Sequence, residues 1–389
     1  MDNVNIEKVV LSDVTKNLDN RRIPLNASQR AEKEENPKYP YIGANNIMGY
    51  IDEYLFDEKI LCVAEDGGSW GYQETCAKIY NEKVWVNNHA HVLIAKENLV
   101  LEYLMYYMNY TNLSLYINGA TRGKLTKSSL NSIKIPLPPL PEQKRIATIL
   151  DAADAYRQKT KALIAKYDEL TQSLFLDMFG DPAKNPFSWE LKTCGDFIDY
   201  LADIGSNGAN KIVSEKLVMS DTEDYAVMIR TTNLNRNDFK NNIKYVSKGV
   251  YDFFKKSQVF GGEIIMNKIG SAGDFWLMPK LEKPVSLGLN QFLIRLKDIN
   301  LMYFYHFLST DYGTINIKSR CNGAATKSIT KTAVRELPIL LPPIDLQNQF
   351  AKRVQAIETQ KAQAQTSLKK AEDLFNCLLQ KAFKGELTQ

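Results

Sequence analysis

The sequence lacks the patterns of secreted, membrane-spanning and metal-rich proteins. Its five cysteines are odd in number and scattered, without a Cys-x-x-Cys pair, which argues against a disulfide framework or a zinc ribbon and favours a reducing compartment. No segment approaches the roughly 18 apolar residues of a membrane span, and the N-terminus has no basic region followed by an apolar run. We therefore expect a cytoplasmic protein. The net charge of +4 permits a polyanionic partner without requiring one.

Enzyme motifs are missing or incomplete. The stretch NGATRGKL, from Asn118, resembles a phosphate-binding loop, but its glycines are one residue too close and Leu125 stands where Ser or Thr is needed. The stretch NPKY, from Asn36, has Lys38 in place of the second proline of the N-P-P-Y motif of amino-methyltransferases. The sequence therefore predicts no catalytic residue in this chain.

The histidine and acidic residues predict no metal or nuclease site. His89 and His91 fall on one face of a predicted strand, but no third ligand accompanies them at a convincing spacing, so polar surface or DNA contact is the favoured interpretation. The acidic pairs Asp52–Glu53 and Glu65–Asp66 lack a lysine pattern typical of nucleases. We interpret these acidic pairs as solvated loop residues.

The chain contains one large internal repeat. The segment NGATRGKLTKSSLNSIKIPLPPLPEQKRI, from Asn118, aligns without a gap with NGAATKSITKTAVRELPILLPPIDLQNQF, which begins 204 residues later at Asn322. Upstream, HVLIAKENLVLEYLMYYM, from His91, aligns with QFLIRLKDINLMYFYHFL, from Gln291, at a shift of 200 residues. A period of this length indicates two globular modules rather than a solenoid.

Each copy predicts the same order of elements. Short β-rich runs such as EKILCVAEDGG and GEIIMNKIGSAG are separated by turn residues. The aromatic segments LEYLMYYM and LMYFYHFL have helical spacing, which favours a helix in the module core over a stacking platform for single strands. The double proline then ends the module, because proline cannot continue a strand ladder, and a long helix begins.

Both long helices carry an apolar stripe with the period of a coiled coil. In the first helix the predicted rows are Ile146, Ala153, Thr160, Tyr167 and Leu174, and three positions later Ile149, Tyr156, Leu163 and Leu170. In the second helix they are Phe350, Ile357, Ala364, Ala371 and Leu378, with Val354, Leu368 and Phe375 four positions after successive members. Helices of about 40 residues, roughly 60 Å long, are too one-sided to be stable alone. We therefore expect them to pair.

These features resemble the DNA specificity subunit of type I restriction-modification systems over essentially the whole chain. The resemblance rests on IKIPLPPLPEQKRIATILDAADA followed by LTQSLFLDMFGDP, and on LPPIDLQNQF with a chain end of LLQKAFKGEL. It implies that each variable module is a target recognition domain for one half of a split DNA site, and that the helices set the gap between the halves.

The resemblance also implies partners and the place of the cofactors. Two methyltransferase subunits would dock around the helices and methylate adenine with S-adenosylmethionine, and two restriction subunits would supply ATP-driven translocation and cleavage. Magnesium is expected in these partners as well. The chain itself is expected to bind no cofactor and no metal.

The candidate DNA contacts are loops that join Lys or Arg to polar side chains, because cations neutralise phosphates while polar groups read base edges. In the first module they are Ser69, Trp70, Asn87, Asn88, His89, Arg122, Lys124 and Lys127. In the second module they are Arg230, Asn233, Asn267, Lys268, Ser271, Asn290, Gln291, Thr326 and Lys327. A place in the core is the alternative for Trp70.

We predict an α+β fold with two mixed α/β target recognition domains, at residues 1–140 and 181–342. Each is followed by a long helix, at 141–180 and 343–389, and the helices pair as an antiparallel coiled coil with pseudo-two-fold symmetry. The predicted function is sequence-specific binding of double-stranded DNA at a bipartite target. The alternatives are a coiled-coil adaptor that does not read DNA, and a self-contained DNA methyltransferase or nuclease.

Overall fold

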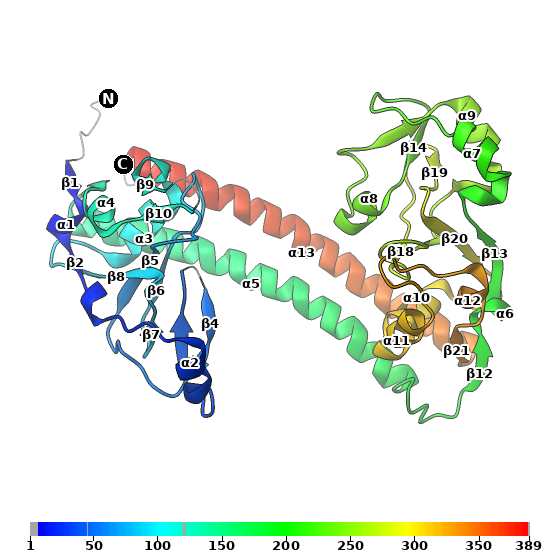
Figure 1. Cartoon of the computed structure of the whole chain (residues 1–389), viewed down its shortest axis with the longest axis horizontal. Helices are drawn as coiled ribbons and strands as arrows, with labels where there is room; N and C mark the ends of the chain where they lie inside the picture. Colours follow the sequence, from blue (N-terminus) through cyan, green and yellow to red (C-terminus); the bar gives the residue numbers. More distant parts are fainter. Residues whose placement is uncertain (1–6, 45, 120–121, 388–389) are drawn as a thin grey trace. The chain divides into compact units, whose positions relative to one another are not determined.

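The computed structural model describes residues 7–44, 46–119 and 122–387 (Figure 1). The chain forms two compact units, which comprise residues 1–162 with 364–389 and residues 163–363. Each unit holds one copy of the repeat and part of both long helices, α5 (Leu140–Phe179) and α13 (Ile344–Lys384). Within the described ranges, no helix is long and apolar enough to cross a membrane.

The first module combines small sheets with short helices. Its strands are β1 (Lys8–Val10), β2 (Thr15–Asn17), β3 (Tyr39–Ile42), β4 (Ile47–Ile51), β5 (Ile60–Ala64), β6 (Ala77–Tyr80), β7 (Trp85–Val86), β8 (Ala90–Ala95), β9 (Ile117–Asn118), β10 (Lys124–Leu125) and β11 (Lys134–Pro136). Its α-helices are α1 (Leu11–Val14), α2 (Ala27–Lys33), α3 (Leu101–Tyr110) and α4 (Lys127–Asn131). The sheets have the strand orders β2-β8-β5-β6, β4-β3-β7, β1-β11 and β10-β9.

The second module repeats this topology. Its strands are β12 (Glu190–Thr193), β13 (Ile198–Ala202), β14 (Ala226–Met228), β15 (Lys244–Val246), β16 (Gln258–Val259), β17 (Ile264–Asn267), β18 (Phe275–Leu277), β19 (Val285–Ser286), β20 (Gln291–Leu296) and β21 (Pro338–Leu341). Its helices are α6 (Cys194–Phe197), α7 (Asn210–Lys216), α8 (Thr231–Arg236), α9 (Lys248–Phe253), α10 (Leu301–Ser309), α11 (Asp311–Ser319) and α12 (Lys331–Arg335). The strand orders β13-β20-β17-β18, β15-β14-β19-β16 and β12-β21 correspond to the first three sheets of the other module, with β16 as an additional edge strand in the second of them.

The aromatic helices α3 and α10 lie in the module cores, as the sequence predicts. Tyr103 is 1% exposed, its hydroxyl donates to the carbonyl of Pro136 at 3.0 Å, and its ring contacts Phe383 of α13. In the second unit, the equivalent Tyr303 donates to Leu340 at 2.7 Å and contacts Phe179 of α5. Each core therefore includes the end of the long helix that does not directly follow its own module.

The repeated glutamine fixes the start of each long helix. The Gln143 side chain is fully buried; its amide nitrogen donates to the carbonyls of Pro138 at 2.8 Å and Asn98 at 3.0 Å, and its oxygen accepts from the Val100 amide at 2.8 Å. Gln347 makes the matching bonds in the second unit, to the carbonyl of Pro342 and from the amide of Asn300. The glutamine thus joins the double proline to the loop that leads into the aromatic helix.

The long helices pair antiparallel in each unit, which confirms that part of the predicted fold. In the first unit Arg157 lies 4.3 Å from the ring of Phe375 and Lys161 forms an ion pair with Glu372. In the second unit Phe175 and Phe179 pack on Phe350, whereas Asp168, earlier in α5, pairs with Lys361, later in α13. Later residues of α5 therefore contact earlier residues of α13, as expected for an antiparallel pair.

One predicted row of the first helix was wrong. Tyr156, Leu163 and Leu170 are 56%, 43% and 49% exposed, whereas positions four residues after the main row, such as Leu150 and Thr171, are buried. The inward row includes the polar residues Arg157 and Thr171, so its hydrophobic pattern is weak in the sequence. The rows predicted for α13 point inward, with Phe350, Val354, Ala364, Ala371 and Phe375 all buried.

We predict that Gln143→Leu lowers the free energy of unfolding by about 2 kcal/mol, because it leaves a buried amide and buried carbonyls without partners. The exposed helix residue Gln363 provides the matched control, and Gln363→Leu should change stability by less than about 0.5 kcal/mol. Chemical denaturation of both variants measures the difference. Equal denaturation midpoints for the two variants would contradict this role of Gln143.

Candidate nucleic-acid interface

Three loops of the first module meet at the end of strand β5. The amide of Glu65, just after β5, donates to the carbonyl of His89 at 2.9 Å, and the amide of Leu125 donates to the carbonyl of Glu65 at 2.8 Å. A β-bridge between Asp66 and Lys124 adds to this contact. We call the place where segments 65–70, 87–91 and 122–127 meet the loop junction of the first module.

The second module has the same loop junction, formed by segments 268–273, 288–291 and 326–331. The amide of Lys268 donates to the carbonyl of Asn290 at 2.7 Å, and the amide of Ile329 donates to the carbonyl of Lys268 at 2.9 Å. The amide of Gly270 also donates to the carbonyl of Lys327 at 3.0 Å. Candidate residues that are distant in sequence are therefore brought together at equivalent places in both modules.

The repeated Asn-Gly dipeptide has a backbone role at each junction. Gly119 and Gly323 have φ values of 103° and 111°, a region that side chains disfavour. A Cβ atom there would lie 2.4 Å from the carbonyl oxygen of Arg122 or 2.2 Å from that of Thr326. Glycine is therefore required at both positions.

Carboxylates hold the basic side chains of the first junction. Glu65 Oε1 lies 3.0 Å from Lys124 Nζ, and its Oε2 lies 2.6 Å from Arg22 Nη1. Burial acts to raise the pKa of Glu65, but the hydrogen bonds from Arg22 and Lys124 outweigh burial and hold that pKa below its ordinary value. Asp66 Oδ1 lies 2.8 Å from His89 Nδ1 and 3.0 Å from Arg122 Nη2.

The interpretation of Glu65 and Asp66 as solvated loop residues was wrong. Glu65 is 9% exposed, and the side chain of Asp66 is 17% exposed. Their partners lie 20 to 60 residues away in the sequence, as with Asp66 and Arg122. The basic residues Arg122 and Lys124 were visible in the sequence, but their pairing with these carboxylates depends on the tertiary fold.

Asp19, Glu65 and His91 have the spacing of a metal site, with ligand-type atoms within 4.8 Å of one another. The guanidinium of Arg22 already forms ion pairs with both carboxylates, at 2.6 Å to Glu65 and 3.5 Å to Asp19. Both ring nitrogens of His91 have partners, Asp19 Oδ2 at 2.6 Å and the carbonyl of Leu125 at 2.7 Å. The cluster is therefore a buried ion network that supports the loop junction.

A single carboxylate organises the second junction. Asp203 contacts Lys331 Nζ at 2.8 Å and Lys268 Nζ at 2.9 Å, and it accepts a 2.7 Å hydrogen bond from Ser206. Burial acts to raise the pKa of Asp203, but the hydrogen bonds from Lys331, Lys268 and Ser206 dominate and hold it far below its ordinary value. Lys331 is thus held by Asp203 and only partly exposed, whereas its counterpart Lys127 begins α4 with an exposed side chain.

The candidate residues divide into an exposed and a buried group. Exposed or partly exposed are Ser69, Asn88, His89, Arg122, Lys124, Lys127, Arg230, Lys268, Ser271, Asn290, Thr326 and Lys327. Buried, at 8% exposure or less, are Trp70, Asn87, Asn233, Asn267 and Gln291. The indole nitrogen of Trp70 donates to the carbonyl of Ala64, which favours its alternative place in the core. The buried group supports the loops from beneath in this conformation.

Arg230 precedes helix α8 and Asn233 lies within it, so both are outside the three loops. The Asn233 side chain accepts a hydrogen bond from the Arg230 amide, and the Arg230 guanidinium donates to the carbonyl of Asn242. The hydroxyl of Thr231 donates to Asn267 at 2.8 Å, which connects the start of α8 to the last residue of β17, just before the second junction. Sequence reasoning did not single out Thr231.

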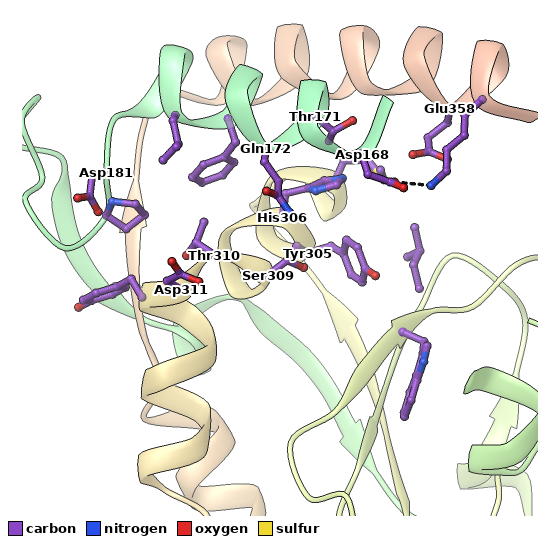
Figure 2. A pocket seen from close by; sticks show the side chains of 18 of the residues that line it. Asp168, Thr171, Gln172, Asp181, Tyr305, His306, Ser309, Thr310, Asp311 and Glu358 are labelled. Carbon is purple, nitrogen blue, oxygen red and sulfur yellow. Dashed lines mark hydrogen bonds and ion pairs between the residues drawn. The ribbon is translucent and has the colours of Figure 1, made fainter. Parts of the chain in front are cut away.

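A cavity of about 1010 Å³ lies in the second unit, between α10 and the two long helices (Figure 2). Its lining carries four carboxylates, Asp168, Asp181, Asp311 and Glu358, against two lysines, Lys184 and Lys361, and this excess of negative charge makes it unfavourable for DNA phosphates. His306 faces this cavity, and burial lowers its pKa to about 4. In the first unit the equivalent positions hold Tyr106 and Phe375, whose rings pack 6.1 Å apart.

The chain matches the family model described as the type I restriction modification DNA specificity domain twice, over residues 3–168 and 186–372. The chain belongs to this family. The two matches correspond to the two copies of the internal repeat, and each extends into a long helix.

Named relatives agree with this assignment. The chain is 36% identical over 150 residues to a putative type I restriction enzyme specificity subunit of Haemophilus influenzae, covering 39% of this chain and 38% of the relative. It is 24% identical over 309 residues to the EcoKI specificity subunit of Escherichia coli, covering 72% and 65% of the two chains. The matches thus span less than two thirds of these relatives. Specificity subunits have a non-catalytic role in type I systems, in agreement with the predicted absence of catalytic residues.

Solved structures confirm the fold class. The S subunit of a type I restriction-modification system from M. genitalium superposes with a TM-score of 0.61 at 16% identity, covering 98% of this chain and 97% of that one. A second chain, from a structural study of complex assembly and conformational transition in a type I system, gives a TM-score of 0.51 at 14% identity and covers 98% of both chains. At these identities the likeness concerns the fold alone.

We predict that acid destabilises the second unit through His306. The pKa of His306 is about 4 in the folded protein, whereas an unperturbed histidine in the unfolded chain has a pKa of 6.5. The unfolded chain therefore binds the proton more tightly. The stabilising effect of the neutral ring is present above pH 6.5 and is lost as the pH falls towards 4, by roughly 2 kcal/mol between pH 7 and pH 5.

The variant His306→Tyr isolates this effect, because it introduces the residue found at the equivalent position of the first module. Denaturant unfolding of the wild type and the variant at pH 7 and pH 5 gives the two pH differences. The wild type should lose more stability than the variant by roughly 2 kcal/mol, since tyrosine does not titrate in this range. Identical losses would show that the pKa of His306 does not differ between the folded and unfolded states.

Proposed function

We propose that this chain is the DNA specificity subunit of a type I restriction-modification system and that each module reads one half of a bipartite double-stranded target. One observation carries this proposal. Two modules place Lys or Arg, Asn or His, and Ser side chains at equivalent loop junctions, for example Lys124 with His89 and Lys327 with Asn290. Cations suit phosphate contact and the polar side chains suit base edges.

The chemistry on DNA belongs to partner subunits in this proposal. Two methyltransferase subunits use S-adenosylmethionine to methylate adenine in each half-site, and two restriction subunits use ATP and magnesium for translocation and cleavage. The chain itself needs no cofactor, and the assembly works on DNA in the cytoplasm. The exposed row Tyr156, Leu163 and Leu170 on α5 supports helix docking by a partner, because three large apolar residues recur there at seven-residue spacing.

Methylation mapping in cells tests the proposed function. The chain is expressed with the methyltransferase encoded beside it, and modified adenines are located by single-molecule sequencing. A split motif with methyladenine in each half, lost on deletion of this chain, is the expected result. Active methyltransferase whose modification pattern does not depend on the chain would overturn the proposal.

Lys327→Ala should weaken binding of both target and random duplexes and should lower the slope of log affinity against log salt by about one, because it removes one phosphate contact. Lys327 is exposed at the second junction, where the amide of Gly270 fixes its backbone. Lys280 lies beyond the opposite end of the β17–β18 hairpin and is also exposed, so Lys280→Ala is the matched control. An equal salt slope for the two variants would remove Lys327 from the interface.

A further inference from the structure

The basic side chains of the first loop junction lie over a layer of carboxylates. The side chain of Arg122 is 66% exposed and that of Lys124 is 49% exposed, whereas their partners Asp66 and Glu65 are 17% and 12% exposed. The guanidinium of Arg122 also lies against Gly67, where an added Cβ atom would approach its Nη2 to 3.0 Å. The cations therefore face solvent while the anions that hold them are largely covered.

The two carboxylates are held to different degrees. Glu65 is fixed by Arg22 from below, at 2.6 Å, as well as by Lys124. Asp66 is held by the two solvent-facing side chains, with His89 at 2.8 Å and Arg122 at 3.0 Å from its Oδ1. If Arg122 and His89 turn towards DNA, Asp66 is the carboxylate that loses its partners and then lies close to a phosphate.

The second junction has a different balance of charge at the same place. Lys268 occupies the place that Glu65 has in the first module. The carbonyl of Glu65 accepts a hydrogen bond from the amide of Leu125, and the carbonyl of Lys268 accepts one from the amide of Ile329. Lys268 and Lys331 share the carboxylate of Asp203, and Lys327 adds a further exposed cation. The first junction instead has three carboxylates, Asp19, Glu65 and Asp66, among the cations Arg22, Arg122, Lys124 and Lys127. It is therefore the less attractive of the two junctions for phosphate alone.

We propose that Asp66 is a specificity-determining residue of the first module, which holds Arg122 and His89 in the free protein and thereby suppresses binding to non-target DNA. A non-target duplex is attracted chiefly through its phosphates. To bind, it must break the ion pair between Arg122 and Asp66, and a phosphate then lies near the uncovered carboxylate of Asp66. The correct half-site adds hydrogen bonds to base edges, and these offset the loss. This inference rests on the proposed function.

The test compares the full-length wild type with Asp66→Asn on two duplexes, the split target identified by methylation mapping and a random sequence of equal length. Asparagine keeps the size and an acceptor oxygen but removes the charge. We expect affinity for the random duplex to rise by up to roughly fivefold at low salt, the range of one partly exposed ion pair, and to fall back as salt screens it. Affinity for the target should rise less, so the ratio of target to random affinity falls.

Two further variants separate charge from structure. Asp66→Glu keeps the charge and should retain most of the wild-type affinity ratio. Asp57→Asn makes the same charge change before the start of β5, where Asp57 pairs with Lys83 at 3.5 Å, and should leave the ratio unchanged. Melting temperatures of all the variants show whether the loops remain folded.

The outcomes distinguish this inference from the proposed function. A wild type that binds the mapped target while Asp66→Asn leaves its affinity ratio unchanged would overturn the inference and leave the function standing. The same holds if Asp66→Asn weakens binding to both duplexes and lowers the melting temperature, since Asp66 would then serve as a loop clamp. A wild type that binds neither duplex, even with its methyltransferase, would instead overturn the proposed function.

Discussion

The buried amide of the glutamine at the start of each long helix is the interaction on which the rest of the structure depends. Two prolines precede it and bring no amide hydrogens, and the glutamine bonds the carbonyl of the first of them in both copies. Its oxygen accepts the amide at residue 100 or 300, just before the aromatic helix. One side chain thereby fixes the direction of the long helix relative to the module that precedes it. An exposed polar residue could not do this, because water would compete for the same groups.

The core of the first module also depends on a distant part of the chain. Phe375, Leu379 and Ala382 of α13 belong to the core of the first module, and Phe175 and Phe179 of α5 belong to that of the second. The first module therefore completes its core with residues more than 200 positions away, near the other end of the sequence. Contacts of such separation carry a large loop-closure cost during folding and slow it. The first module lacks part of its apolar core until α13 has formed.

Features that depend on local sequence and recur in both copies could be predicted from the sequence. Contacts between side chains of different elements could not. The double proline, the glutamine and the helical spacing of Tyr103 and Tyr303 mark elements in both copies. The second inward row of α5 was missed because Arg157 is polar in sequence, although its guanidinium packs on Phe375. Glu65 and Asp66 look like loop acids, and only the fold places His89 and Arg122 on them. The burial of Trp70 likewise depends on contacts that no spacing rule contains.

The two loop junctions show how one backbone supports two different surfaces. The bonds that form each junction run between main-chain groups, such as Glu65 to His89 in one module and Lys268 to Asn290 in the other. Main-chain bonds do not depend on side-chain identity, so an acid at one junction can stand where the other has a lysine. The two glycine positions do constrain the sequence, because a side chain at Gly119 or Gly323 would collide with a carbonyl oxygen. A duplicated module can therefore keep its framework while its exposed side chains diverge, which is what reading two unlike half-sites requires.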